Sequence, residues 1–210
     1  TTAHGASGAN NSYWPEMYVN MPIVDPARRH PYSDSPSPKR FGTVSPFDPA
    51  LFARVDDFAQ ELLQGERKGR YSPVEVAQSL EDWAGAAAKS LVQAEASAAG
   101  PKSPEFRRLA IDVAIQSGLG RFFAAKLRSG VLWALYERSG DRTAGQEALT
   151  AYRAARAAWA ELANRAQGVY RPDVTAGYDS HLRGHWLDRL PAVDDDIADM
   201  EKRLQQARPG

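Results

Sequence analysis

The sequence predicts an all-α protein, a bundle of about five helices preceded by a long irregular arm rich in proline and aromatic residues. Apolar residues recur at spacings of three and four through most of residues 48–210, and helix start and stop signals bound each run. Residues 1–47 show no such periodicity. We therefore expect two parts, an irregular N-terminal arm over 1–47 that could line a pocket, and a helical bundle domain over 48–210.

The first two helices are expected over residues 49–64 and 73–99. Asp48 followed by proline is typical of a helix N-cap, and Gly65 is a stop signal. The second helix has a clearer start, because Ser72 and Glu75 form a capping-box pattern. The residues expected on the buried faces are Leu51, Phe52, Val55, Phe58, Leu62 and Leu63 in the first helix, and Val76, Leu80, Trp83, Ala87, Leu91, Ala94 and Ala98 in the second.

The next two helices, expected over 104–139 and 142–166, should form an antiparallel hairpin. Ser103 is a start signal for the longer helix. Gly140 and Asp141 provide a C-cap followed directly by an N-cap, so the link is short. Glycine inside a helix costs up to about 1 kcal/mol relative to alanine, so glycines there predict a kink or a close helix contact. Three such glycines are Gly118, Gly120 and Gly130.

The last helix is expected over residues 190–207. Its apolar residues follow the spacing of a single buried face, namely Leu190, Val193, Ile197, Met200 and Leu204. The aspartates expected on the opposite, solvated side are Asp194, Asp195, Asp196 and Asp199.

Composition limits the classes of partner. Lys and Arg together number 26, as do Asp and Glu, so the formal net charge is zero. This balance argues against binding to nucleic acid or to an anionic membrane. No apolar run approaches the length of a membrane span. Cysteine is absent, which excludes disulfides, thiolate metal sites and cysteine nucleophiles.

The first candidate site lies in the arm, in the stretch "HGASGANNSYWPEMY" over residues 4–18. Aromatic faces stack on sugar rings, while amides and carboxylates bind hydroxyl groups. The residues of these types are His4, Asn10, Asn11, Tyr13, Trp14, Glu16 and Tyr18. The structural alternative is that the aromatic side chains anchor the arm onto the bundle. Glycoside hydrolysis normally needs two carboxylates and this stretch has one, so no catalytic residue is assigned.

The second candidate site is "YDSHLRGHWLDR", residues 178–189. His181 and His185 have a spacing that suits metal, but Leu182 stands where the zinc-protease pattern needs glutamate, so no metal or cofactor is expected. Arg183 with His181 and His185 could bind an anionic ligand, because the guanidinium group of arginine matches a carboxylate. The structural alternative is that these side chains cap helices and pair with carboxylates.

Three stretches resemble the C-terminal part of large bacterial glycoside hydrolases, and the α-glucuronidase type, in which a helical region follows a (β/α)8 barrel, is the most similar. They are "NNSYWPEMYVNMPIVD", "SPSPKRFGTVSPFDPALF" and "GYDSHLRGHWLDRLPAVDDDI".

The resemblance implies that the opening stretch lines a sugar pocket and that the helices support this pocket or a dimer. The main catalytic acids would belong to an upstream catalytic domain. An oligosaccharide would be the ligand, and the location would be secreted or periplasmic.

Two functions of different classes follow from these observations. In the first, the chain is an accessory helical C-terminal part of a carbohydrate-active enzyme, which supplies contacts rather than the main chemistry. In the second, it is a non-catalytic helical protein–protein interaction module. The first function predicts that Trp14 and Tyr18 are accessible to solvent and lie beside Asn and Glu side chains. The second predicts an exposed apolar patch on the bundle.

Overall fold

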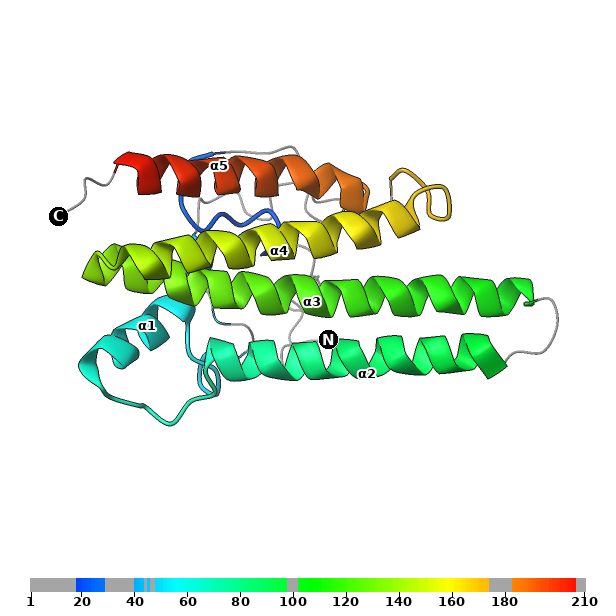
Figure 1. The fold of residues 1–210 in the computed structure, drawn as a ribbon, viewed down its shortest axis with the longest axis horizontal. Coiled ribbons are helices and arrows are strands. Elements are labelled where there is room, and N and C mark those ends of the chain that lie inside the picture. Colours follow the sequence, from blue (N-terminus) through cyan, green and yellow to red (C-terminus); the bar gives the residue numbers. More distant parts are fainter. Residues whose placement is uncertain are drawn as a thin grey trace.

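Five α-helices account for most of the chain in the computed structural model, so the predicted all-α bundle is confirmed (Figure 1). The structure describes residues 18–28, 40–43, 45, 48–97, 102–173 and 183–206, and these contain no strand. The elements are the 3-10 turn η3 (Phe41–Thr43), α1 (Val55–Gln64), α2 (Pro73–Ser97), α3 (Pro104–Ser139), α4 (Arg142–Ala166), the 3-10 turn η5 (Trp186–Arg189) and α5 (Leu190–Gln206).

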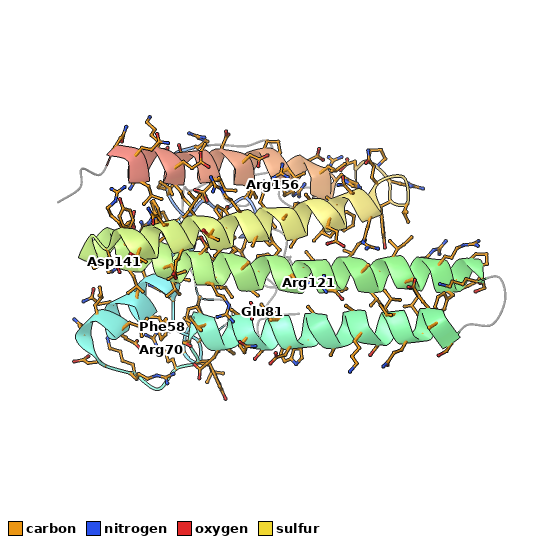
Figure 2. All side chains as sticks on the ribbon, viewed as in Figure 1. Phe58, Arg70, Glu81, Arg121, Asp141 and Arg156 are labelled. Carbon is orange, nitrogen blue, oxygen red and sulfur yellow. The ribbon has the colours of Figure 1, made fainter. Side chains whose placement is uncertain are left out.

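The helices are arranged around α3, the longest of them (Figure 1). It packs against α2 on one side and against α4 on the other, and α5 covers the far side of α4. Arg156 of α4 lies between α4 and α5, where its Nε is 2.8 Å from the Asp194 carboxylate (Figure 2). The short helix α1 contacts α3 near the start of α2.

The predicted helix caps are present at three of the helix starts. The Ser72 hydroxyl accepts from Glu75 N at 3.1 Å, and Ser72 N donates to the Glu75 carboxylate at 2.8 Å, which completes the capping box. Ser103 accepts from Phe106 N at 3.2 Å, and Asp141 accepts from Thr143 N at 2.9 Å. These local signals explain why α2, α3 and α4 begin where the sequence predicts.

The first helix begins six residues later than predicted, at Val55 rather than at 49. Asp48 caps a turn instead, where its Oδ1 accepts from Ala50 N at 2.9 Å. The chain then runs extended, because Ala53 N donates to Tyr71 O and Tyr71 N donates to Leu51 O, each at 2.9 Å. Leu51, Leu62 and Leu63, predicted to be buried, are exposed. The stop at Gly65 is confirmed, with φ of 67°.

The predicted buried face of α2 is wrong at Trp83, which is 68% exposed, and at Ala94, which is also exposed. The helix packs mainly on α3, which runs beside it in Figure 1, so only a narrow stripe is covered. That stripe contains Val76, Ala77 and Ala84. Trp83 lies on its flank, because one residue turns the helix by about 100° and Ala84 occupies the contact itself.

The glycines inside α3 mark close contacts, and the helix runs unbroken through them. A Cβ built on Gly118 would lie 2.7 Å from Leu162 Cβ of α4, and one on Gly120 would lie 3.1 Å from Ala84 Cβ of α2. Gly130 meets the Phe41 ring in the same way, at 3.2 Å. The lack of a side chain at these positions lets the neighbouring elements approach α3 closely.

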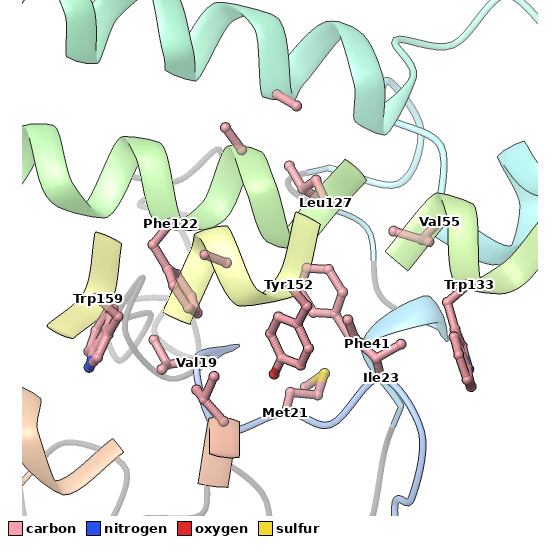
Figure 3. Close-up of a cluster of buried hydrophobic side chains, with 14 of the residues drawn as sticks. Val19, Met21, Ile23, Phe41, Val55, Phe122, Leu127, Trp133, Tyr152 and Trp159 are labelled. Carbon is pink, nitrogen blue, oxygen red and sulfur yellow. The ribbon is translucent and has the colours of Figure 1, made fainter. Parts of the chain in front are cut away.

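Part of the arm belongs to the core of the bundle. Val19, Met21, Ile23 and Val24 are each at most 3% exposed. Figure 3 shows the labelled residues of this segment beside Tyr152, Phe41 and other core side chains. We call residues 18–24 the strap, because they cross the interior as a non-helical segment between helices.

Candidate functional site

The strap is held by a lysine that is fully buried. Lys126 of α3 is 0% exposed, and its Nζ donates to the main-chain oxygens of Tyr18 at 2.9 Å, Val19 at 2.8 Å and Met21 at 2.7 Å. An ammonium group has three donors, so three carbonyl oxygens match its capacity. The Phe41 ring adds a cation–π contact, with its centroid 4.8 Å from Nζ.

An aspartate on α5 holds the other end of the strap, and we call Lys126 and Asp196 together the clamp. Asp196 is 3% exposed, and its carboxylate accepts from Ile23 N at 2.7 Å and from Val24 N at 3.0 Å. The prediction that Asp196 lies on the solvated side of the last helix is therefore wrong. The physical reason is that two main-chain donors of the strap and the charge of Lys126 compensate its burial.

Tyr152 of α4 completes this buried polar cluster. It is 1% exposed, and burial together with the neighbouring Asp196 raises the pKa of its hydroxyl well above the usual value. Burial also raises the pKa of Asp196, against the opposing influence of Lys126 and of the strap N–H groups. The groups of the clamp are engaged with the main chain of the strap, so the arrangement holds a segment in place rather than presenting a reactive group.

Most of the predicted sugar-contact residues fall outside the described part of the chain. These are His4, Asn10, Asn11, Tyr13, Trp14 and Glu16. Tyr18 is described, and it is partly buried and packs against the core. Its main-chain oxygen binds Lys126. The first residue that the clamp binds is therefore two residues after Glu16.

Of the second predicted site, residues 183–189 are described, and residues 183–185 lead into η5, which the remaining four form. Arg183 is exposed and pairs with Asp173, with Nη2 2.6 Å from the carboxylate. Gly184 N donates to the same carboxylate at 2.8 Å. Arg189 is 5% exposed and donates to the main-chain oxygens of Arg183 at 2.6 Å and His185 at 3.2 Å. The structure therefore brings Arg183 and His185 together on one turn.

His185 is 7% exposed and caps η5. Its Nδ1 accepts from Leu187 N at 3.1 Å, while His185 N donates to Asp188 at 2.6 Å. An imidazole whose Nδ1 accepts carries its proton on Nε2, and this buried atom has no hydrogen-bond partner among the described residues. The ring also contacts Trp186 edge to face, with centroids 5.4 Å apart. His181 lies outside the described residues.

A shallow hollow of about 20 Å³ lies on the surface where α3 meets α4. Its lining includes the small residues Ala114, Gly118 and Ala158 and the charged residues Arg121 and Arg165. Figure 2 shows Arg121 on α3. The hollow has room for about one water molecule, so it is too small to enclose a sugar ring.

Two further properties concern metals and membranes. Within the described residues, no group of three or more His, Asp or Glu side chains could hold a metal ion. None of the helices formed by those residues is long and apolar enough to span a bilayer.

Sequence reasoning missed the clamp. Each of its two residues looks like part of a solvated helix face, because charged residues surround Asp196 in the sequence and Arg128 follows Lys126 closely. The position of Lys126 in its helix is the sequence feature that could have indicated its burial. It lies four residues after Phe122 and one before Leu127, within the buried stripe of α3.

Comparison with known proteins shows a similarity of fold. No protein-family model matches the sequence, and no curated protein matches it. Among solved structures, the chain is similar to a GH138 enzyme targeting pectin rhamnogalacturonan II, with a TM-score of 0.56 and 13% sequence identity. The match covers 72% of this chain and 23% of that chain, so this chain spans less than a quarter of the enzyme. The chain therefore resembles, distantly and in fold, a helical part of a glycoside hydrolase.

Proposed function

We propose that the chain is an accessory helical part of a carbohydrate-active enzyme of the glycoside hydrolase class. Its role would be to supply contacts to a sugar pocket or to support a dimer, while the main catalytic acids belong to another domain. The observation that carries the proposal is the fold match, in which most of this bundle corresponds to a minor share of a much larger hydrolase.

The ligand class follows from two observations. The neighbour in fold targets pectin rhamnogalacturonan II, and the name galacturonan denotes a polymer of galacturonic acid, a sugar that carries a carboxylate. Arg183 is exposed at the turn before η5, where its guanidinium already binds one carboxylate, that of Asp173. A sugar carboxylate could replace the carboxylate of Asp173 and bind the guanidinium group in the same geometry. We therefore propose an acidic oligosaccharide as ligand, with stacking supplied by Trp14 and Tyr18 and hydroxyl contacts by His4, Asn10, Asn11, Tyr13 and Glu16.

The test is calorimetric titration of the chain with oligogalacturonides, and with neutral xylo-oligosaccharides for comparison. We expect binding of the acidic ligand, with affinity lowered about tenfold by Trp14→Ala, since stacking on an aromatic face is worth up to about 1.5 kcal/mol. Trp83→Ala is the matched control, because Trp83 is 68% exposed on α2, and it should leave affinity unchanged.

The same variants separate a binding role of Trp14 from an anchoring role. A binding residue leaves the melting temperature nearly unchanged on substitution, whereas loss of a buried tryptophan destabilises by about 3–5 kcal/mol. A large loss of stability in Trp14→Ala with unchanged affinity would contradict the proposal. Absence of binding to both ligands would contradict it as well.

A second candidate is a helical protein–protein interaction module, and the observation that favours it is the exposure of single large apolar side chains on α2. Trp83 is 68% exposed and Val92 is 64% exposed. They are nine residues apart, which places them on opposite flanks of the helix, so they do not form one continuous patch. Sedimentation velocity over a range of concentrations tests self-association through this helix. A dimer that Trp83→Ala dissociates would favour the second candidate.

A further inference from the structure

We propose that the strap, residues 18–24, is a conformational latch that leaves and re-enters its seat between α3 and α5 as one unit while the helices stay folded. Lys126 and Asp196 hold it closed in a single register. The proposal concerns how the bundle works mechanically, and it stands whether or not the chain binds a sugar.

The contacts of the strap explain why it can move separately from the helices. Its main-chain groups bind side chains that are 105 to 173 residues distant in sequence, those of Lys126 and Asp196. The helices close their own backbone hydrogen bonds internally, and α3 meets α4 through contacts of its own. Gly118 packs on Leu162, and Phe122 packs edge to face on Trp159 with centroids 4.9 Å apart. Opening the strap therefore leaves this helix pair intact.

The register of the strap is fixed by side chains and main chain together. Val19, Met21 and Ile23 lie within the cluster drawn in Figure 3, and Val24 belongs to the same core. The carbonyl groups of residues 18, 19 and 21 face Lys126, and the N–H groups of residues 23 and 24 face Asp196. A slip by one residue would move each core side chain out of its place, as register slips do in strands. It would also move these polar groups away from the charges that bind them.

The buried charges make opening an all-or-none event. A half-detached strap leaves Lys126 or Asp196 in the interior without the main-chain groups that compensate its burial, and a buried charge that has lost its partner is strongly unfavourable. Complete opening admits water to both charges. Partly seated states are therefore less populated than the closed and the fully open states.

Native-state hydrogen exchange of the whole chain tests the latch. We expect the amides of Ile23 and Val24 to exchange through an opening with a smaller denaturant dependence than that of the amides at Tyr152 and Trp159 in α4, because less surface is exposed. Asp196→Asn should lower protection of the strap amides at least about tenfold relative to the α4 amides, because hydrogen bonds to a charged group are stronger than those to a neutral one.

Asp194→Asn is the matched control, being the same substitution on the same helix at a surface pair with Arg156, and it should leave the ratio unchanged. Ile23→Ala gives a second route, because it loosens the strap without altering either charge, and it should also lower strap protection selectively. The latch is excluded if strap and α4 amides share one opening free energy and one denaturant slope, or if Asp196→Asn lowers the protection of all these amides equally. Sugar titration of the same variants is independent of these outcomes.

Discussion

At the scale of single residues, Lys126 stands out because its charged group is fully buried and needs several compensating contacts. Its charge is fully buried and is compensated by carbonyl dipoles, aromatic faces and the nearby Asp196. We expect Lys126→Met to lower the free energy of unfolding by about 3–5 kcal/mol, because the substitution removes the positive charge near the buried Asp196 and leaves the main-chain oxygens of Tyr18, Val19 and Met21 without their donor. Urea denaturation measures this. Lys89→Met, at an exposed position of α2, should change stability by less than about 0.5 kcal/mol.

The raised pKa of Asp196 predicts a pH dependence with a defined sign. Because burial raises the pKa in the folded state above the ordinary value, protonation favours folding. The resulting stability is present below the unfolded pKa and is lost as pH rises through the folded pKa. Compared with Asp196→Asn, the wild-type protein should therefore lose relative stability as pH rises across the acidic range. A constant difference between the two at all pH values would contradict the assignment.

Substitution by alanine should change the stability of the protein in opposite directions at two glycines. A Cβ on Gly118 would lie 2.7 Å from Leu162 Cβ, so Gly118→Ala should destabilise by about 1–3 kcal/mol through overpacking. Gly85 on α2 has open space around its Cβ position, so Gly85→Ala should stabilise by about 0.5–1 kcal/mol. Thermal unfolding of both variants checks the pair. If both substitutions raised the melting temperature, the α3–α4 contact would have rearranged to accommodate the added methyl group.

At the scale of the elements, the start of α2 depends on its capping box. Hydrogen bonds from Ser72 lower the pKa of Glu75, so the carboxylate contributes stability above the unfolded pKa that is lost as pH falls through the folded pKa. Ser72→Ala should destabilise by about 0.5–2 kcal/mol at neutral pH. The difference in the free energy of unfolding between Ser72→Ala and the wild type should become smaller in acid. Denaturation at two pH values measures this change.

The elements also show which features a sequence can predict. The starts of α2, α3 and α4 follow from Ser72, Ser103 and Asp141, because capping acts within four residues of chain. The start of α1 does not follow in this way, because the backbone pairs with Tyr71, which is distant in sequence. The burial of Asp196 escapes prediction for the same reason, since its partners are 172 and 173 residues away. Local sequence signals therefore predict helix starts correctly except where contacts between residues distant in sequence determine the structure.

At the scale of the whole molecule, an ionic cluster around Arg40 joins the arm to α1, α3 and α5, in addition to the clamp. Arg40 binds Asp56 of α1 at 3.0 Å and Glu137 of α3 at 2.5 Å, and Glu137 also binds Arg203 of α5 at 3.2 Å. These pairs are partly buried, so Arg40→Gln should lower stability by about 1 kcal/mol. The effect should shrink at about 1 M salt, where screening is strong. An effect that salt leaves unaltered would indicate lost packing instead.

The candidate site is less predictable than the fold. Arg183 and His185 lie on one turn, but the sequence does not indicate that His185 is buried or that Asp173 neutralises Arg183. Periodicity reports which face of a helix is covered, and it carries no information on which distant polar group will meet that face. This is why the helices follow from the sequence and the clamp on the strap does not.

The uneven exposure of the tryptophans has an optical consequence. Trp133 and Trp159 are at most 1% exposed, whereas Trp83 is 68% exposed on the outer side of α2. Iodide in solution should quench the emission of Trp83 and spare that of the other two. Any protein or sugar that covers α2 would shift the emission of Trp83 to shorter wavelength and remove its quenching. Comparison with Trp83→Ala separates this signal from the emission of Trp14 and Trp186, so Trp83 reports on the coverage of α2.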